Sequence, residues 1–123
     1  MLDRTLAEKR AKELLTGFPP RLVEAYLTFA ETGDPERLDA VVLGVLHFYL
    51  ARKPAGELEA LPGATRLIED LGCDSLTMMD MVFMIESLLD VKIDDAELVR
   101  ILTLDDLRQH LRAHLKTAGA PNA

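Results

Sequence analysis

The tetrapeptide TGDP at residues 32–35 is the feature that most limits how this chain can fold. Glycine commonly ends a helix, aspartate is a favoured N-cap, and proline fits the first turn of a helix. One helix therefore ends and the next begins within four residues. Gly17, followed by Pro19-Pro20, predicts a similar break earlier in the chain.

Apolar residues recur at helical spacing along most of the chain, and no stretch alternates apolar and polar residues as a half-buried strand does. The stretch 54–70 contains two prolines and two glycines in its first ten residues: Pro54, Gly56, Pro62 and Gly63. We therefore expect a long connecting loop there. The sequence predicts an all-α fold, with helices over about 3–15, 20–32, 35–52, 75–90, 95–100 and 103–116.

Charge is unevenly distributed along the 123 residues, whose net charge is −7. Residues 69–106 contain eleven acidic residues against two basic ones, a local net charge of −9. Nucleic acids and anionic membrane surfaces attract basic faces, so both are disfavoured as partners. The acidic segment suits basic partner proteins, although a merely soluble acidic surface is an equally good interpretation.

Several features favour a cytoplasmic protein. The single cysteine, Cys73, excludes an internal disulfide and suits a reducing compartment. The amino-terminal residues lack a signal-peptide pattern. The longest apolar stretch, residues 40–51, is too short to cross a bilayer, so we expect no membrane insertion.

The predicted helix 75–90 carries two apolar stripes. One is an ordinary core face, and the opposite arc places large apolar residues among acids, including Met79, Asp80, Phe83 and Glu86. We interpret this outer stripe as a docking surface. The alternative is that Met79 and Phe83 pack under the amino-terminal helices.

Asp74 and Ser75 lie at the start of this helix. Either one would serve as an ordinary N-cap. An anion attached to the Ser75 hydroxyl would instead meet the positive end of the helix dipole. The two residues alone leave both readings open.

A longer pattern adds to this. It consists of Leu71-Gly72-Cys73-Asp74-Ser75-Leu76, an acidic helix, Ile93-Asp94-Asp95, and Thr103-Leu104-Asp105-Asp106-Leu107. These elements, in this order and spacing, closely resemble an acyl carrier protein. With helix 35–52 as the first helix of the family, the resemblance covers about 35–117 and implies a four-helix bundle with two additional amino-terminal helices.

The resemblance implies that Ser75 carries 4′-phosphopantetheine, transferred from coenzyme A by a phosphopantetheinyl transferase. It places Asp74, Leu76, Met79, Asp80 and Glu86 where the family contacts transferases and synthases with basic docking patches. A carrier of this kind catalyses nothing and delivers thioester-bound acyl groups. Related alternatives are a peptidyl or polyketide carrier, and an unmodified helical interaction module.

The chain also departs from the family pattern. Thr77, Ser87 and Leu88 stand where fatty-acid carriers often have acids, and Cys73 stands where Ala or Gly is common. These differences favour a dedicated lipid or secondary-metabolite pathway over general fatty-acid synthesis.

Other candidate sites are weaker. Cys73 has no neighbouring histidine in the sequence, so we do not expect a catalytic nucleophile. His110 and His114 have the i, i+4 spacing of a metal pair, but no third ligand motif accompanies them. We therefore expect solvent-facing histidines and no metal site.

Residues 1–33 lie outside the resemblance and have apolar faces of their own. Helix 35–52 has one stripe that closes a carrier bundle, with Phe48 and Tyr49 on it, and a second stripe formed by Leu43, Leu46 and Leu50. We expect residues 1–33 to pack on that second stripe of the carrier domain, 34–117, or to form a homodimer. Residues 118–123 are expected to be a frayed tail.

Overall fold

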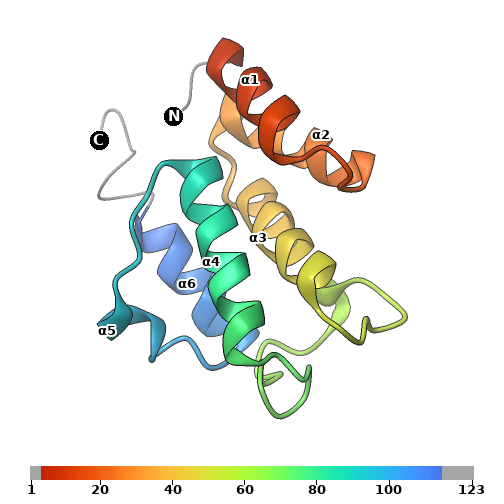
Figure 1. Ribbon diagram of the computed structural model, residues 1–123, viewed down its shortest axis with the longest axis vertical. Coiled ribbons are helices and arrows are strands. Elements are labelled where there is room, and N and C mark those ends of the chain that lie inside the picture. The colour runs from red at the N-terminus through yellow and green to blue at the C-terminus, as the bar shows by residue number, and fades with distance from the viewer. Residues whose placement is uncertain (1–3, 115–123) are drawn as a thin grey trace.

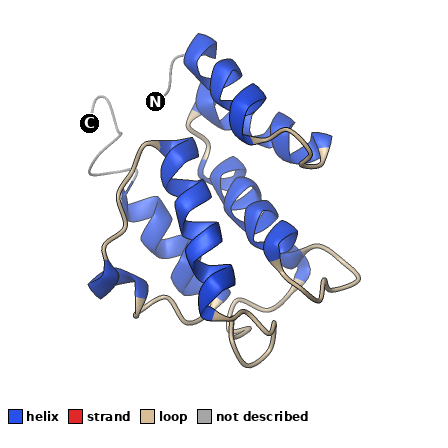
Figure 2. Ribbon diagram, viewed as in Figure 1, coloured by secondary structure: helices blue, strands red, loops and turns tan. Residues whose placement is uncertain are grey.

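The computed structural model describes residues 4–114, and all their regular secondary structure is helical (Figures 1 and 2). The all-α prediction is therefore confirmed for this part of the chain. The predicted tail, 118–123, lies outside the described residues. The elements are α1 (Arg4–Leu14), α2 (Pro20–Thr32), α3 (Pro35–Tyr49), the 3₁₀ turn η1 (Leu58–Ala60), α4 (Ser75–Leu89), α5 (Asp95–Leu98) and α6 (Leu104–His114).

The break between α2 and α3 follows from the TGDP sequence. Gly33 adopts a left-handed conformation, with φ of 72°, which a residue without a Cβ atom reaches at little cost. The Asp34 carboxylate accepts a hydrogen bond from the Glu36 amide at 3.0 Å, and Pro35 occupies the first helical position. The predicted start of α3 is confirmed.

The end of α3 was predicted about three residues too late. The helix stops at Tyr49, and Leu50 is extended yet buried. The Leu50 carbonyl accepts a hydrogen bond from the Lys53 ammonium at 2.9 Å instead of continuing the helix. Helical periodicity identified Leu50 as a core residue, but burial alone does not reveal that the backbone has left the helix.

A similar difference concerns Phe48, which was predicted to lie in the core. Its side chain is 37% exposed and stacks on Phe18, with ring centroids 3.9 Å apart. The Tyr49 ring forms T-shaped contacts with both of these rings. The loop between α1 and α2 therefore supplies an aromatic partner that a wheel drawn for α3 alone does not show.

The α1–α2 pair packs against α3 and α4 and shares their hydrophobic core (Figure 1). A Cβ atom on Gly44 of α3 would come within 2.8 Å of the Leu22 side chain, so the missing side chain lets α2 approach closely. The second stripe of α3 is fully buried. The stripe consists of Leu43, Leu46 and Leu50. Buried residues of the amino-terminal extension lie in the same core cluster: Ala7, Leu15, Leu22, Tyr26 and Phe29.

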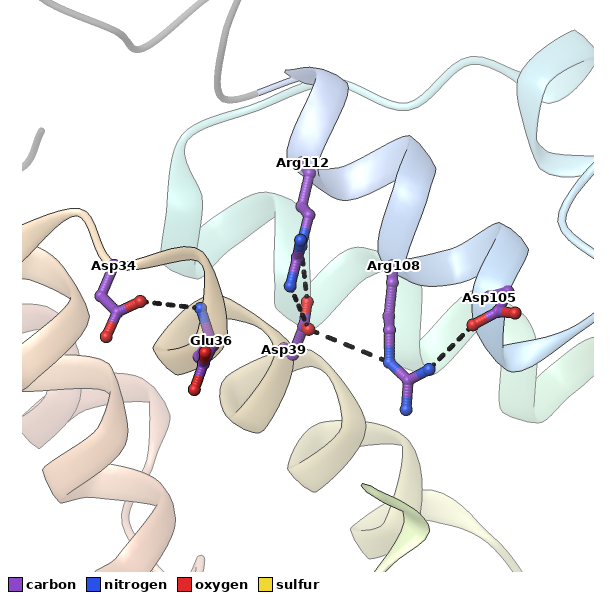
Figure 3. Close-up of polar contacts among 6 residues, drawn as sticks. All are labelled: Asp34, Glu36, Asp39, Asp105, Arg108 and Arg112. Carbon is purple, nitrogen blue, oxygen red and sulfur yellow. Dashed lines mark hydrogen bonds and ion pairs between the residues drawn. The ribbon is translucent and has the colours of Figure 1, made fainter. Parts of the chain in front are cut away.

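Two arginines tie α6 to α3 (Figure 3). The Arg112 guanidinium donates to both carboxylate oxygens of Asp39, at 3.1 and 2.5 Å. Arg108 lies 3.9 Å from the same carboxylate and pairs with Asp105 at 2.9 Å. Bidentate arginine pairing fixes orientation as well as distance, so these contacts set how α6 lies beside α3.

The connection from α3 to α4 is more ordered than the predicted loop. It contains the turn η1, and Arg66 pairs with Thr103 in an isolated antiparallel bridge. Thr103 then starts α6 as a capping box. Its hydroxyl accepts from the Asp106 amide at 3.1 Å, and the Asp106 carboxylate accepts from the Thr103 amide at 3.1 Å.

Among the described residues, no helix is long and apolar enough to cross a membrane.

Candidate functional site

The amino end of α4 distinguishes the roles of Asp74 and Ser75. Asp74 is the N-cap, because its carboxylate accepts a hydrogen bond from the Thr77 amide at 2.8 Å. That hydrogen bond lowers the pKa of Asp74. Ser75 is the first helical residue and is exposed, and its hydroxyl has no hydrogen bond within residues 4–114. The cap is thus Asp74, and the serine hydroxyl is available.

A short turn presents this serine to solvent. Gly72 has φ of +70°, a conformation that L side chains rarely adopt, and it lies between buried Leu71 and Cys73. The Cys73 amide bonds to the Leu67 carbonyl at 2.9 Å, which holds the turn against the core. The chain is therefore anchored immediately before Asp74 and turns outward at Ser75.

Cys73 lies close to the serine but is unsuited to nucleophilic chemistry. Burial, followed by the charge of Asp74, raises the pKa of the Cys73 thiol to about 11. Because the thiolate is the reactive form, the side chain is unreactive near neutral pH. Its small size fits the packed turn.

The two predicted faces of α4 are both present. The predicted core face is buried along the whole helix. On the other side, Leu76, Met79 and Phe83 are 65%, 63% and 68% exposed. The alternative, in which Met79 and Phe83 pack under the amino-terminal helices, is wrong. The buried residues are Met78, Met81, Val82, Ile85, Leu88 and Leu89.

The acidic residues of the outer stripe differ in their surroundings. Asp80 is exposed. Burial, followed by the charge of Asp80, raises the pKa of Tyr49 on α3. Glu86 is half-buried, and its carboxylate accepts a hydrogen bond from the Ile93 amide at 2.8 Å. Glu86 therefore also holds the link between α4 and α5, a role that its charge and spacing did not reveal.

His110 and His114 of α6 were predicted to face solvent, but both contact an acidic side chain instead. His110 Nδ1 lies 2.8 Å from one carboxylate oxygen of Glu97, and His114 Nε2 lies 2.6 Å from the other. All three side chains are partly buried. Helical spacing placed the histidines on one face of α6, but only the fold brings Glu97 of α5 to that face.

The carboxyl end of α4 is held by residues from outside the carrier pattern. The buried Tyr26 hydroxyl on α2 donates to the Leu88 carbonyl at 2.8 Å. Arg10 on α1 donates to the same carbonyl at 3.4 Å and lies 3.9 Å from Asp90. The helical spacing of Tyr26 predicted its burial, whereas nothing in the sequence indicated its hydrogen-bond partner.

Comparisons with known proteins find relatives for part of the chain. Residues 55–111 match the model of a family described as a phosphopantetheine attachment site. An acyl carrier protein of Thermotoga maritima is 44% identical over 50 residues, 41% of this chain and 62% of that protein. An acyl carrier protein of Desulforapulum autotrophicum is 32% identical over 54 residues, 44% of this chain and 69% of that protein.

The chain belongs to the acyl carrier protein family. It spans less than two thirds of the Thermotoga maritima relative and slightly more than two thirds of the other. No solved structure matches it. The matched residues begin after α3, so the family match does not include the α1–α2 pair.

The cofactor of an acyl carrier protein is covalently attached 4′-phosphopantetheine. The amino end of α4 fits such a group, because Ser75 offers an exposed hydroxyl with no competing hydrogen bond in the described residues. A phosphodiester there would lie at the positive end of the helix dipole. The phosphopantetheine arm supplies a thiol that holds an acyl group as a thioester.

Proposed function

We propose that Ser75 is the residue that carries 4′-phosphopantetheine in this carrier. The observation that supports this assignment most is the exposed Ser75 hydroxyl at the first position of α4. Asp74 supplies the helix cap and thereby leaves the serine oxygen without a structural task. The buried thiol of Cys73 offers no competing nucleophile.

The attachment reaction uses the serine oxygen as the nucleophile. Ser75 Oγ attacks the phosphorus that bears the pantetheine arm in coenzyme A and loses its proton to a base of the transferase. The new P–O bond forms as the pyrophosphate bond breaks, and adenosine 3′,5′-bisphosphate leaves. Mg²⁺ bound in the transferase offsets the phosphate charge during this step.

The outer face of α4 is the surface we propose for docking partner enzymes. Leu76, Met79 and Phe83 supply apolar contacts, and the exposed Asp80 supplies negative charge. Large apolar side chains exposed together on one helix favour a protein contact over a solvated surface. The fitting partners are a phosphopantetheinyl transferase and acyl-transferring or synthase enzymes with apolar pockets beside basic residues.

A specialised pathway fits this surface better than general fatty-acid synthesis. Thr77 and Ser87 flank the apolar stripe in place of the acids that the family often has there, and the Ser87 hydroxyl donates to the Phe83 carbonyl at 2.9 Å. A docking face of this composition relies more on apolar contact and less on charge. A carrier of peptidyl or polyketide units is the related alternative.

We further propose that residues 34–117 form the carrier domain and that residues 1–33 are an extension packed on it. Burial of Leu15, Leu22 and Tyr26 within one chain supports this packing over a homodimer. The carrier itself would catalyse no reaction. A cytoplasmic location agrees with the single buried cysteine.

Mass spectrometry of the intact protein tests the assignment. Incubation with coenzyme A, Mg²⁺ and a broad-range transferase should add one phosphopantetheine to the wild type and none to Ser75→Ala. Ser87→Ala is the matched control, because it removes a serine hydroxyl from the same helix and should be modified normally. An unmodified wild type with several transferases would favour the unmodified interaction module, and a modified Ser75→Ala would place the arm elsewhere.

A further inference from the structure

The Leu88 carbonyl near the carboxyl end of α4 receives hydrogen bonds from two different helices. The Tyr26 hydroxyl of α2 donates to it at 2.8 Å, and the Arg10 guanidinium of α1 donates to it at 3.4 Å. Tyr26 is completely buried, so its hydroxyl has no access to water. Both donors belong to the extension, which the family match does not include.

This carbonyl needs a partner from outside its own helix. The last four carbonyls of a helix have no intrahelical donor, and a buried one is costly to leave unpaired. The Glu86 carbonyl accepts a hydrogen bond from the Asp90 amide at 2.9 Å, which closes the final turn. Asp90 itself has φ of 58°, a conformation that is uncommon for a residue other than glycine.

We propose that Tyr26 and Arg10 are positioning residues that fix the last two turns of α4 and so orient the docking face. The inference rests on the proposed docking role of that face. Phe83 and Glu86 lie in those two turns, and Glu86 also holds Ile93. The extension then helps to orient the surface with which this carrier recognises its partners.

Amide hydrogen exchange tests whether the Tyr26 and Arg10 hydrogen bonds hold the carboxyl end of α4. Tyr26→Phe removes only the hydroxyl, and exchange at residues 86–90 should accelerate roughly two- to tenfold, the range of one hydrogen bond. Arg21→Gln is the matched control, because it breaks an exposed ion pair of α2 with Glu57 that does not reach α4. Equal exchange in Tyr26→Phe and wild type would overturn the proposal.

A double-mutant cycle tests whether the Tyr26 hydrogen bond affects partner binding through the position of Phe83. The probe is a broad-range phosphopantetheinyl transferase with coenzyme A, and the readout is the KM for the carrier. Tyr26→Phe should raise KM roughly two- to tenfold with kcat unchanged, and should have little further effect in the Phe83→Ala background. The same rise in both backgrounds would mean a general loss of stability and would overturn positioning.

Two further outcomes separate this proposal from the function on which it rests. If wild type is modified and Phe83→Ala alone leaves KM unchanged, the proposed docking role of this face is wrong. The exchange experiment then still decides whether Tyr26 and Arg10 hold the carboxyl end of α4. If Tyr26→Phe fails to fold, Arg10→Gln removes the second donor from the edge of the same site. It should accelerate exchange at residues 86–90 in the same direction, and unchanged exchange would overturn the proposal.

Discussion

The two ends of α4 are built in different ways. The amino end is local, since Asp74 caps the helix from the adjacent position and Ser75 follows it. The carboxyl end depends on Tyr26 and Arg10, which are more than sixty residues away in the chain. In Figure 1 the α1–α2 pair lies at the end of the molecule opposite the start of α4.

This difference separates a chemical role from a positional one. A self-contained amino end keeps Ser75 available whatever surrounds the rest of the bundle. A carboxyl end that depends on the extension makes the orientation of the docking face a property of the whole chain. The proposed attachment residue thus lies within the family match, whereas the orientation of the proposed docking face also depends on residues outside it.

Deletion of residues 1–33 should have the largest effect on this comparison, because it removes the Tyr26 and Arg10 contacts of α4 and leaves the local motif at its amino end intact. Large buried side chains such as Leu15, Leu22 and Tyr26 each contribute on the order of 1.5–3 kcal/mol before ordering costs. Thermal unfolding and size-exclusion chromatography should show a marked loss of stability or aggregation. A truncated protein that remains monomeric and equally stable would break the comparison.

Substitutions between the two ends should distinguish the faces of α4. Ile85→Ala empties a buried site and should lower the free energy of unfolding by about 2–5 kcal/mol. Phe83→Ala removes an exposed ring and should change it by less than about 0.5 kcal/mol, while weakening acyl or phosphopantetheine transfer. Urea denaturation measures both values. Unfolding of Phe83→Ala would show that this residue belongs to the core.

Acid should break the Asp74 cap and leave the Tyr26 hydrogen bond to Leu88 in place, which is the smallest of these effects. The Thr77 amide lowers the pKa of Asp74 below its usual 3.8, so the stabilising hydrogen bond is fully present above that pH. It is lost as pH falls through the lowered pKa. Burial raises the pKa of Tyr26 above 10, so the carboxyl-end hydrogen bond does not titrate in acid.

The amide proton shifts of Thr77 and Leu89, followed by NMR as the pH is lowered, measure this difference. The Thr77 shift should move with pH in wild type and stay constant in Asp74→Asn, and the Leu89 shift, which reports on the peptide group of the Leu88 carbonyl, should move little before global unfolding. Equal movement at both ends would contradict a local amino end.

The sequence predicted those features that depend on neighbouring residues, namely the helix boundaries and the faces of single helices. Glycine, proline and capping residues marked the helices, and the wheel for α4 identified its buried and exposed faces. Apart from the end of α3, the errors concern side chains whose partners lie in other elements. Phe48 stacks on a loop that precedes α2, and His110 and His114 meet Glu97 on α5. Periodicity describes one helix at a time, so it carries no information about such partners.

The most direct test of the central claim is the mass of the full chain purified from its native cells, with the modified peptide located by fragmentation. We predict the mass of the polypeptide plus one phosphopantetheine, with or without an acyl group, on the peptide that contains Ser75. The attached acyl group would also identify the cargo. A chain that carries no phosphopantetheine in those cells, or carries it on another residue, would contradict the account.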